Sequence, residues 1–352
     1  MYGCRLPESL TRRKHMKKST LNRLLFALLL ALALGLAACD PMAPQPTPVA
    51  VIVSPEPSLT FTPAATDTPA PTRTPVPTET PDMPPTATPF PCDEDTGRII
   101  EFTQFPSAVA GGENLRYNVY IPPCYQETRA RFPYVILLHG MSYREQQWED
   151  LGVIETLEQG IRLGALPPMI LVMPYYGNIG QLNSFPPDIS YESVILEELV
   201  PAVETDFCVW ANRDYRAIGG ISRGGFWAYS IGFRHPDIFG ILGGHSAFFP
   251  ESTRDVPAAF NPLELAQNSA LLEDANLRLY LDNGAADPAG LSIQQLSNRL
   301  EQRGIEHAYI INPSGEHDND YWSAHVSDYL AFYGRDWPRS YDQLPSCLEP
   351  SP

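Results

Sequence analysis

The stretch that runs from Arg216 to Ala228 constrains the fold of this chain more than any other. An apolar run leads into Gly220-Ile221-Ser222-Arg223-Gly224, and a helix-like segment, Phe226–Phe233, follows. A G-x-S-x-G pattern between a strand and a helix is typical of a sharp turn that exposes a nucleophilic serine. The two glycines are required because a Cβ at either position would collide with the neighbouring strand or helix. The pattern also arises by chance, and a glycine-rich turn without chemistry is the simpler alternative.

From residue 95 onward, short apolar runs alternate with helical stretches. Several runs are almost continuously apolar, as expected of parallel strands that are buried on both faces. The alternation predicts an α/β fold with a doubly wound, mostly parallel sheet, helices on both faces and two antiparallel strands at its start. The predicted strands are Tyr117–Ile121, Tyr134–Leu138, Met169–Met173, Tyr215–Gly219, Ile238–Gly243, Leu277–Leu281 and His307–Ile311, and the predicted helices are Glu149–Gln159, Glu192–Thr205, Phe226–Arg234, Leu291–Arg303 and Trp322–Tyr333.

A catalytic reading of the serine requires an acid and a histidine at the same edge of the sheet, where the carboxyl ends of the strands meet. His317 fits, because it lies in the loop after a late strand. Asp287 lies in the loop after the strand before it, and Asp282, which ends that strand, is the alternative acid. The order Ser222, Asp287, His317 is that of serine hydrolases with a strand–turn–helix nucleophile. His245 follows the strand directly after the serine helix, which is the wrong place in this order. The remaining histidines lie in the leader, before the serine, or on a turn, a strand start or a terminal helix: His15, His139, His235, His307 and His325.

These residue types suit acyl transfer. A serine hydroxyl becomes a good nucleophile when a base takes its proton, and His317 is the predicted base and later the acid for the leaving group. Asp287 would fix the tautomer of the imidazole and stabilise its charged form. The backbone N–H of Arg223 is the first predicted oxyanion donor. Met141 follows Leu137–Gly140 and is the second, unless that segment is a plain turn at the end of a strand.

Residues 1–38 are predicted to be a lipoprotein signal peptide. Basic residues between Arg12 and Arg23 precede the apolar run Leu24–Leu36, which is shorter than the ~20 residues of a membrane-spanning helix. Leu36-Ala37-Ala38-Cys39 resembles a lipobox, so Cys39 is the predicted lipidated first residue of an exported chain, anchored to the bacterial cell membrane and facing the extracytoplasmic side. An ordinary signal peptide with an incidental cysteine is the alternative.

Residues 39–91 are rich in Pro and Thr and form the predicted tether, because dense proline favours extended polyproline II and the apolar content is too low for a core. Residues 92–352 are the predicted globular domain. The formal net charge is −17, and every lysine lies within the first 18 residues. So acidic a body is a poor partner for nucleic acid.

Four cysteines remain in the predicted exported body: Cys92, Cys124, Cys208 and Cys347. An even number in an oxidising compartment predicts two disulfides, with three possible pairings. A hairpin around Gly111-Gly112 would bring Cys92 near Cys124 and leave Cys208 for Cys347, which is the favoured pairing. A C-x-x-C spacing is absent, which argues against a zinc site, and no metal or other cofactor is expected.

Residues 113–335 contain several short motifs in a fixed order, among them Leu137–Gly140, Gly220–Gly225 and Gly315 with His317. With these motifs, this part of the chain resembles the esterase D/feruloyl esterase family of α/β-hydrolases. That family includes acetylxylan, feruloyl and enterochelin esterases, formylglutathione hydrolases and mycolyltransferases. The resemblance implies the α/β-hydrolase fold, the triad Ser222, Asp287 and His317, and the oxyanion pair Met141 and Arg223. The matching pieces are Tyr120–Pro123, Leu137–Gly140, Glu198–Pro201, Gly220–Gly225, Arg234–Asp237, Gly284 with Asp287, Gly315 with His317, and Tyr321-Trp322. Cys124 departs from the pattern, since many relatives have glycine there.

The sequence therefore predicts an exported serine carboxylic-ester hydrolase that forms an acyl-enzyme on Ser222. Its expected substrates are small-molecule or polysaccharide-linked esters, with feruloyl or acetyl groups, or siderophore esters. Aromatic residues near the serine suit sugar rings or phenolic acyl groups, although the same residues also suit packing. The alternatives are an acyltransferase of the mycolyltransferase type on the same fold and a catalytically silent surface-binding lipoprotein. The aromatic residues are Tyr143, Trp148, Tyr175, Tyr176, Phe185, Phe226 and Trp227.

Overall fold

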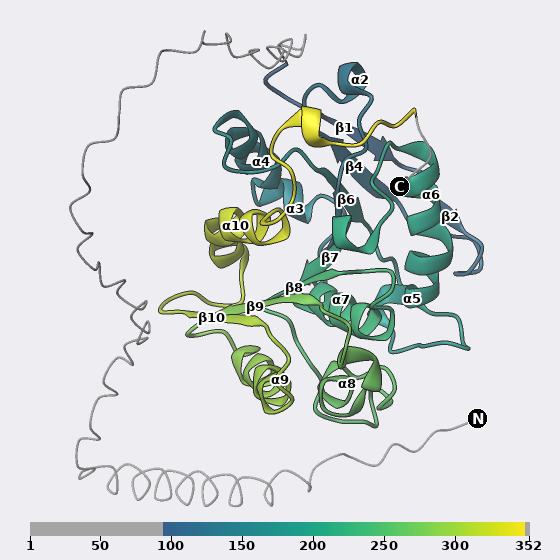
Figure 1. Ribbon diagram of the computed structural model, residues 1–352. Helices are drawn as coiled ribbons and strands as arrows, with labels where there is room; N and C mark the ends of the chain where they lie inside the picture. Colours follow the sequence, from purple (N-terminus) through teal and green to yellow (C-terminus); the bar gives the residue numbers. More distant parts are fainter. Residues whose placement is uncertain (1–93, 349–352) are drawn as a thin grey trace, which may run out of the picture. The chain divides into compact units, whose positions relative to one another are not determined.

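The computed structural model describes residues 94–348, which build an eight-stranded sheet with helices on both faces (Figure 1). The strand order is β1-β4-β6-β5-β7-β8-β9-β10. β4 is antiparallel to β1 and β6, and all pairings from β6 to β10 are parallel. The predicted α/β-hydrolase sheet with antiparallel lead strands is confirmed. The strands are β1 Arg98–Phe102, β4 Tyr117–Ile121, β5 Tyr134–Leu138, β6 Ile170–Pro174, β7 Arg216–Ile221, β8 Ile241–His245, β9 Arg278–Gly284 and β10 Ala308–Asn312.

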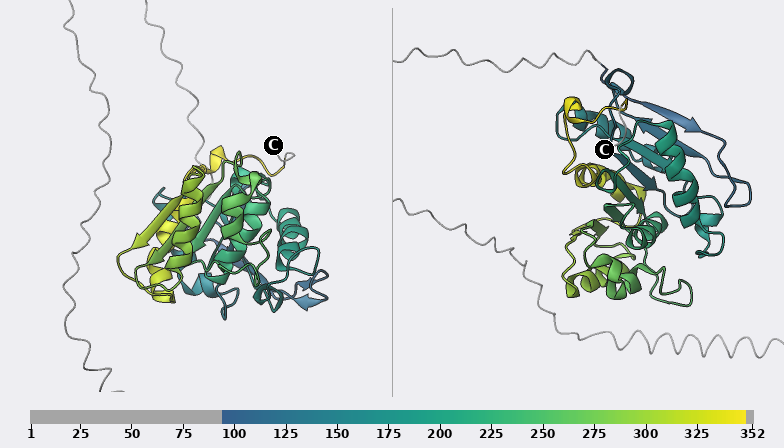
Figure 2. Two further views of the ribbon diagram at one scale, coloured as in Figure 1. Left: turned by 90° about the horizontal axis from the view of Figure 1, so that it is seen from below. Right: turned by 45° about the vertical axis from the view of Figure 1, so that its right-hand side comes forward.

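Two apolar layers fill the spaces between the sheet and its helices. Tyr134, Ile136 and Leu138 of β5 join the core under α7, α8 and α9, whereas Val135 and Leu137 of the same strand join the core under α3, α4 and α10. This alternation along one strand is the reason why the strand is apolar throughout. Figure 2 shows the layers from two further sides. These helices are α3 Gln147–Asp150, α4 Val153–Arg162, α7 Arg223–Arg234, α8 Pro262–Asn268, α9 Gly290–Gln302 and α10 Asn319–Tyr333.

Two predicted helices are wrong in detail. The segment predicted as one helix, Glu149–Gln159, is divided between α3 and α4, because Gly152 adopts a left-handed conformation with φ of 81°. The segment Glu192–Thr205 contains a π-helical turn, Val194–Leu199, between α5 (Tyr191–Ser193) and α6 (Val200–Asp206). Pro201 in the first turn of α6 has no N–H to donate to the preceding turn, which permits the wider winding.

The predicted amino-terminal hairpin is confirmed as the antiparallel pair β1 and β4. Its connection carries Gly111 and Gly112 at φ of 67° and 89°, and also a two-stranded sheet, β2 (Pro106–Ser107) with β3 (Glu113–Asn114), which is too short to leave a pattern. Among residues 94–348, no helix has the length and apolar character needed to cross a membrane. The predicted signal peptide 1–38, the lipidation site Cys39 and the tether 39–91 lie outside the described residues.

The predicted disulfide between Cys208 and Cys347 is confirmed. It fixes the carboxyl-terminal segment beside the start of β5, where Cys347 N–H also donates to Arg129 O and Phe132 N–H to Cys208 O. Cys124 is disulfide-bonded as well, and its predicted partner Cys92 lies outside the described residues.

Replacing Cys208 and Cys347 together by serine will lower the free energy of unfolding by about 2–5 kcal/mol, because the disulfide restricts a long loop of the unfolded chain. The bonded cysteines are separated by 139 positions in the sequence. Urea denaturation followed by tryptophan fluorescence measures the change. A loss below about 1 kcal/mol would mean that the crosslink does not restrain the unfolded chain.

Candidate active site

Ser222 lies at the sharp turn between β7 and α7, with φ of 54° and ψ of −112°. Its N–H donates to His245 O on the neighbouring strand, so the strained conformation is held in place. The flanking glycines are sterically required. A Cβ on Gly220 would lie 2.5 Å from the Gly224 carbonyl carbon, and a Cβ on Gly224 would lie 2.4 Å from Leu138 O. The predicted steric reason for both glycines is therefore confirmed.

The loops after β9 and β10 bring Asp287 and His317 to Ser222. His317 Nε2 is 2.9 Å from Ser222 Oγ, and His317 Nδ1 is 2.9 Å from Asp287 Oδ1. Both distances are those of hydrogen bonds. The imidazole side chain is 28% exposed and the Asp287 side chain is fully buried. The buried Asp287 carboxylate, the partly exposed His317 ring and the Ser222 hydroxyl thus form one chain of hydrogen bonds.

The environment of Asp287 keeps its carboxylate ionised. Burial alone would raise the pKa of Asp287, but hydrogen bonds from His317 and the Ala289 N–H, the nearby Ser246 hydroxyl and the charge of the His317 ring lower it below its ordinary value. The Ala289 N–H donates to Oδ1 at 2.7 Å. An ionised carboxylate can accept the imidazole N–H and stabilise the ring when it is positively charged.

Asp282, the alternative acid, does not contact His317 in the structure. Its Oδ1 lies 2.9 Å from His245 Nδ1, and its Oδ2 accepts hydrogen bonds from the hydroxyls of Tyr321 and Tyr329. Asp282 and His245 are both fully buried. Sequence reasoning missed this second histidine–aspartate pair. The two residues are partners in the register of β8 and β9, which becomes visible only once the strand pairing is known.

The residues predicted to bind an oxyanion lie on adjoining segments. Arg223 is the first residue of α7, and Met141 follows the end of β5 by three positions. A Cβ on Gly224 would lie 2.7 Å from His139 O, so the loop after β5 packs directly on the first turn of α7. Among the loop and cap hydrogen bonds of residues 94–348, neither the Met141 nor the Arg223 N–H is used. Both donors are therefore left for another acceptor.

The side chain of Arg223 has a structural role that is separate from its backbone N–H. Its Nε donates to Gly180 O at 3.0 Å and its Nη2 to Leu182 O at 2.7 Å, and the guanidinium lies over the rings of Phe226 and Trp227. Burial lowers the pKa of Arg223 to about 10. The Arg223 side chain therefore links the segment around the 3₁₀ turn Ile179–Gln181 to α7.

Most aromatic residues that the sequence placed near the serine form part of the core. Only Tyr143, 37% exposed, is classed among the exposed large hydrophobic side chains. Phe248, which the sequence analysis missed, is 55% exposed and its N–H lies 3.3 Å from Ser222 O. Met141 is 51% exposed. Met141, Tyr143 and Phe248 thus present apolar surface to solvent. The buried aromatic residues are Trp148, Tyr176, Phe185, Phe226 and Trp227.

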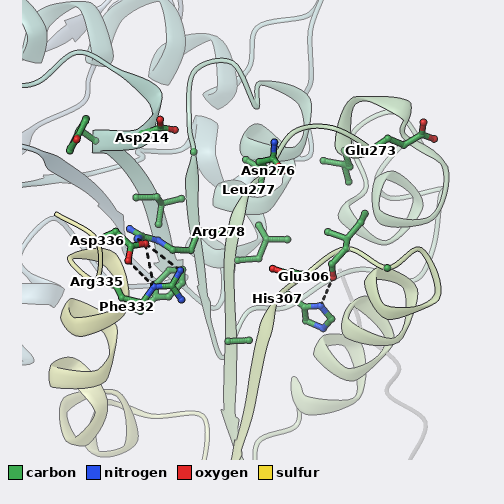
Figure 3. A pocket seen from close by; sticks show the side chains of 18 of the residues that line it. Asp214, Glu273, Asn276, Leu277, Arg278, Glu306, His307, Phe332, Arg335 and Asp336 are labelled. Atoms are coloured by element: carbon green, nitrogen blue, oxygen red, sulfur yellow. Dashed lines mark hydrogen bonds and ion pairs between the residues drawn. The ribbon is translucent and has the colours of Figure 1, made fainter. Parts of the chain in front are cut away.

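A polar groove of about 1270 Å³ lies at the opposite edge of the sheet, across the amino ends of β8, β9 and β10. Figure 3 shows Arg278, Arg335 and Asp336 at its α10 side and His307 at its α9 side. Asp336 pairs with both arginines, and both ring nitrogens of His307 are hydrogen-bonded. No serine or cysteine is among the lining residues. The lining of the groove therefore offers neither a serine hydroxyl nor a cysteine thiol, and Arg278, Arg335, Asp336 and His307 already have partners.

Across residues 94–348, no cluster of three or more His, Cys, Asp or Glu side chains has the geometry to hold a metal ion.

Comparisons with known proteins identify the family of the chain. A family described as "Putative esterase" matches residues 108–333. An endo-1,4-β-xylanase/feruloyl esterase of Xylanibacter ruminicola is 30% identical over 180 residues, which are 47% of this chain and 24% of the relative. An esterase of Mycobacterium tuberculosis is 32% identical over 148 residues, which are 41% of this chain and 31% of the relative. The structure of a ferulic acid esterase matches with a TM-score of 0.60 and 23% identity, over 68% of this chain and 99% of that protein.

The chain spans about a quarter to a third of the length of these two curated relatives. The similarity to the solved ferulic acid esterase supports the fold. The family match covers more than half of the chain and includes the segments that carry Ser222, Asp287 and His317. The resemblance drawn from the sequence is thereby confirmed. This chain belongs to the esterase family of α/β-hydrolases.

Proposed function

We propose that this protein is an exported serine carboxylic-ester hydrolase that acts through an acyl-enzyme on Ser222. The observation that carries the proposal is the imidazole of His317, which lies 2.9 Å from both Ser222 Oγ and Asp287 Oδ1. In the first half-reaction, His317 Nε2 takes the proton of Ser222 while Oγ attacks the ester carbonyl. Asp287 holds Nδ1–H and stabilises the charged ring. The same proton then leaves with the alcohol.

In the second half-reaction, water attacks the acyl-enzyme. His317 removes a proton from the water and returns it to Ser222 Oγ when the carboxylic acid departs. The tetrahedral intermediates carry a negative oxygen, and the free N–H groups of Met141 and Arg223 are the proposed donors to it. Their unused hydrogen-bonding capacity and their position on adjoining segments support this assignment.

The proposed substrates are acyl groups attached to polysaccharide, with siderophore esters as the alternative. The family relationship supports esters, and relatives named as feruloyl esterases favour a phenolic or acetyl group on a sugar. The exposed side chains of Met141, Tyr143 and Phe248 offer apolar contacts to such an acyl group without enclosing a long chain.

Cys39 is proposed to carry a lipid that anchors the exported chain to the cell membrane. The sequence pattern of residues 1–39 supports this part of the proposal. An alkyne fatty acid fed to expressing bacteria should label the natural chain and leave Cys39→Ser unlabelled. Equal labelling of both chains would argue against a lipid at Cys39.

A fluorophosphonate probe and a panel of esters test the enzymatic proposal. The soluble fragment 92–352 should be labelled by the probe, should be protected from it by an ester that it hydrolyses, and should turn over feruloyl or acetyl esters faster than long-chain esters. A chain that resists labelling would be the catalytically silent lipoprotein.

Product analysis with and without a sugar acceptor separates hydrolysis from acyl transfer. The 28% exposure of the His317 side chain gives water a route to the base, which favours hydrolysis. We expect free acid as the main product even with acceptor present. An acylated sugar as the main product would identify a transferase instead.

A further inference from the structure

Ser246 lies directly after β8 and is fully buried. It has a left-handed backbone, with φ of 48°, which is strained for any residue other than glycine. Its N–H donates to Asp282 O, and its hydroxyl oxygen accepts a hydrogen bond from Trp322 Nε1 at 2.9 Å. Because the indole can only donate, the hydroxyl hydrogen of Ser246 must point to a different acceptor.

One carboxylate oxygen of Asp287, Oδ2, can accept a further hydrogen bond. Its Oδ1 receives the His317 ring nitrogen and the Ala289 N–H, whereas its Oδ2 is buried and has no hydrogen bond of regular geometry in the described residues. The Ser246 hydroxyl is nevertheless close enough to favour the ionised carboxylate. A buried oxygen without a donor is costly, and a buried hydroxyl without an acceptor is costly too. A hydrogen bond from the Ser246 hydroxyl to Oδ2 would satisfy both groups.

We propose that Ser246 is a positioning residue for Asp287, which accepts from Trp322 and donates to Oδ2, so that Oδ1 stays directed at His317. This inference rests on the proposed function of the site. The carboxylate could otherwise rotate about its Cβ–Cγ bond, since His317 and the Ala289 N–H both hold the same oxygen. The Trp322 ring also lies edge-on to the His317 ring, with centroids 5.2 Å apart. A single indole therefore contacts the base directly and the acid through Ser246.

Ser246→Ala and Ser246→Gly both remove the hydroxyl, and glycine also relieves the left-handed strain, so at least the glycine variant is expected to fold. We expect kcat to fall about ten- to hundredfold in both variants, as expected for an unsatisfied buried acceptor, with KM changed less than about twofold. Titration with a fluorophosphonate should still count one reactive serine per chain, but its labelling rate should fall in parallel with kcat. Ser230→Ala is the matched control, because this buried hydroxyl donates to Phe260 O, remote from the acid.

A double-mutant cycle gives the sharper test. If Ser246 acts through the Asp287 carboxylate, Ser246→Ala should cost less than about twofold in a chain that already carries Asp287→Asn. Equal cost in both backgrounds, or an unchanged kcat in both Ser246 variants, would overturn the inference. A fall in the number of reactive serines at unchanged kcat per site would also overturn it and show a role in folding only. A natural chain that neither hydrolyses esters nor reacts with the probe would instead refute the proposed function.

Discussion

Ser222→Ala will lower kcat for p-nitrophenyl acetate by roughly a million-fold and abolish labelling by a fluorophosphonate. The variant removes the hydroxyl oxygen that lies 2.9 Å from His317 Nε2, so no acyl-enzyme can form at this position. The fold should survive. Alanine keeps the Cβ that already sits at φ of 54°, and the N–H bond to His245 O belongs to the backbone.

Ser230→Ala is again the matched control, because Ser230 is a buried serine on the same helix, α7, and contacts Phe260 O rather than His317. It should retain kcat within a few-fold of the natural chain. Urea denaturation of both variants separates lost chemistry from lost folding. If Ser222→Ala retained ester turnover while Ser230→Ala behaved as expected, the nucleophile would lie elsewhere and the proposed acyl-enzyme would be wrong.

Much of the parallel sheet could be predicted, because its strands are buried on both faces and leave continuous apolar runs. The predicted strand bounds are wrong where apolar residues next to a strand pack in a turn. The strand predicted as Ile238–Gly243 is Ile241–His245 in the structure, since the Ile238 N–H bonds to His235 O in a turn. The reverse holds for β9, which continues through Asp282 and Asn283 because both are buried. Because these two residues are polar, the sequence pattern indicates a loop where the strand in fact continues.

The line of Ser222, Asp287 and His317 could be anticipated because chain order and strand ends place loops at one edge of a parallel sheet. The contacts that surround it could not. Ser246 and Trp322 meet across 76 positions, and His245 meets Asp282 across strands whose pairing no periodicity reveals. Each buried donor and acceptor needs a hydrogen-bond partner in the folded structure. Residues far apart in the sequence supply those partners, so a pattern along the chain does not reveal them.

Asp287→Asn will mainly lower kcat, whereas Asp282→Asn will mainly lower the free energy of unfolding. Asp287→Asn is expected to lower kcat by about 10⁴-fold, because an amide cannot hold the required imidazole tautomer or stabilise the charged ring. The lowered pKa of Asp287 keeps the natural carboxylate ionised at neutral pH.

Asp282→Asn should instead cost mainly stability. The Asp282 side chain is fully buried and contacts His245, Tyr321 and Tyr329. An asparagine has one acceptor oxygen in place of two, and its amide hydrogens would face groups that already donate. Breaking such a buried network is expected to lower the free energy of unfolding by about 3–5 kcal/mol.

Urea denaturation and kcat per titrated serine, measured on both variants, decide between the two aspartates. The assignment of Asp287 requires a large loss of kcat per site with a small loss of stability, and the assignment of Asp282 to the buried network requires the reverse. Should Asp282→Asn lose more activity per reactive serine than Asp287→Asn, the acid that serves His317 in solution would be Asp282. His317 would then have to leave Asp287 and bind Asp282. That change would break the three buried hydrogen bonds that Asp282 makes with His245, Tyr321 and Tyr329. Because those bonds are satisfied only in the observed arrangement, we expect the activity to follow Asp287.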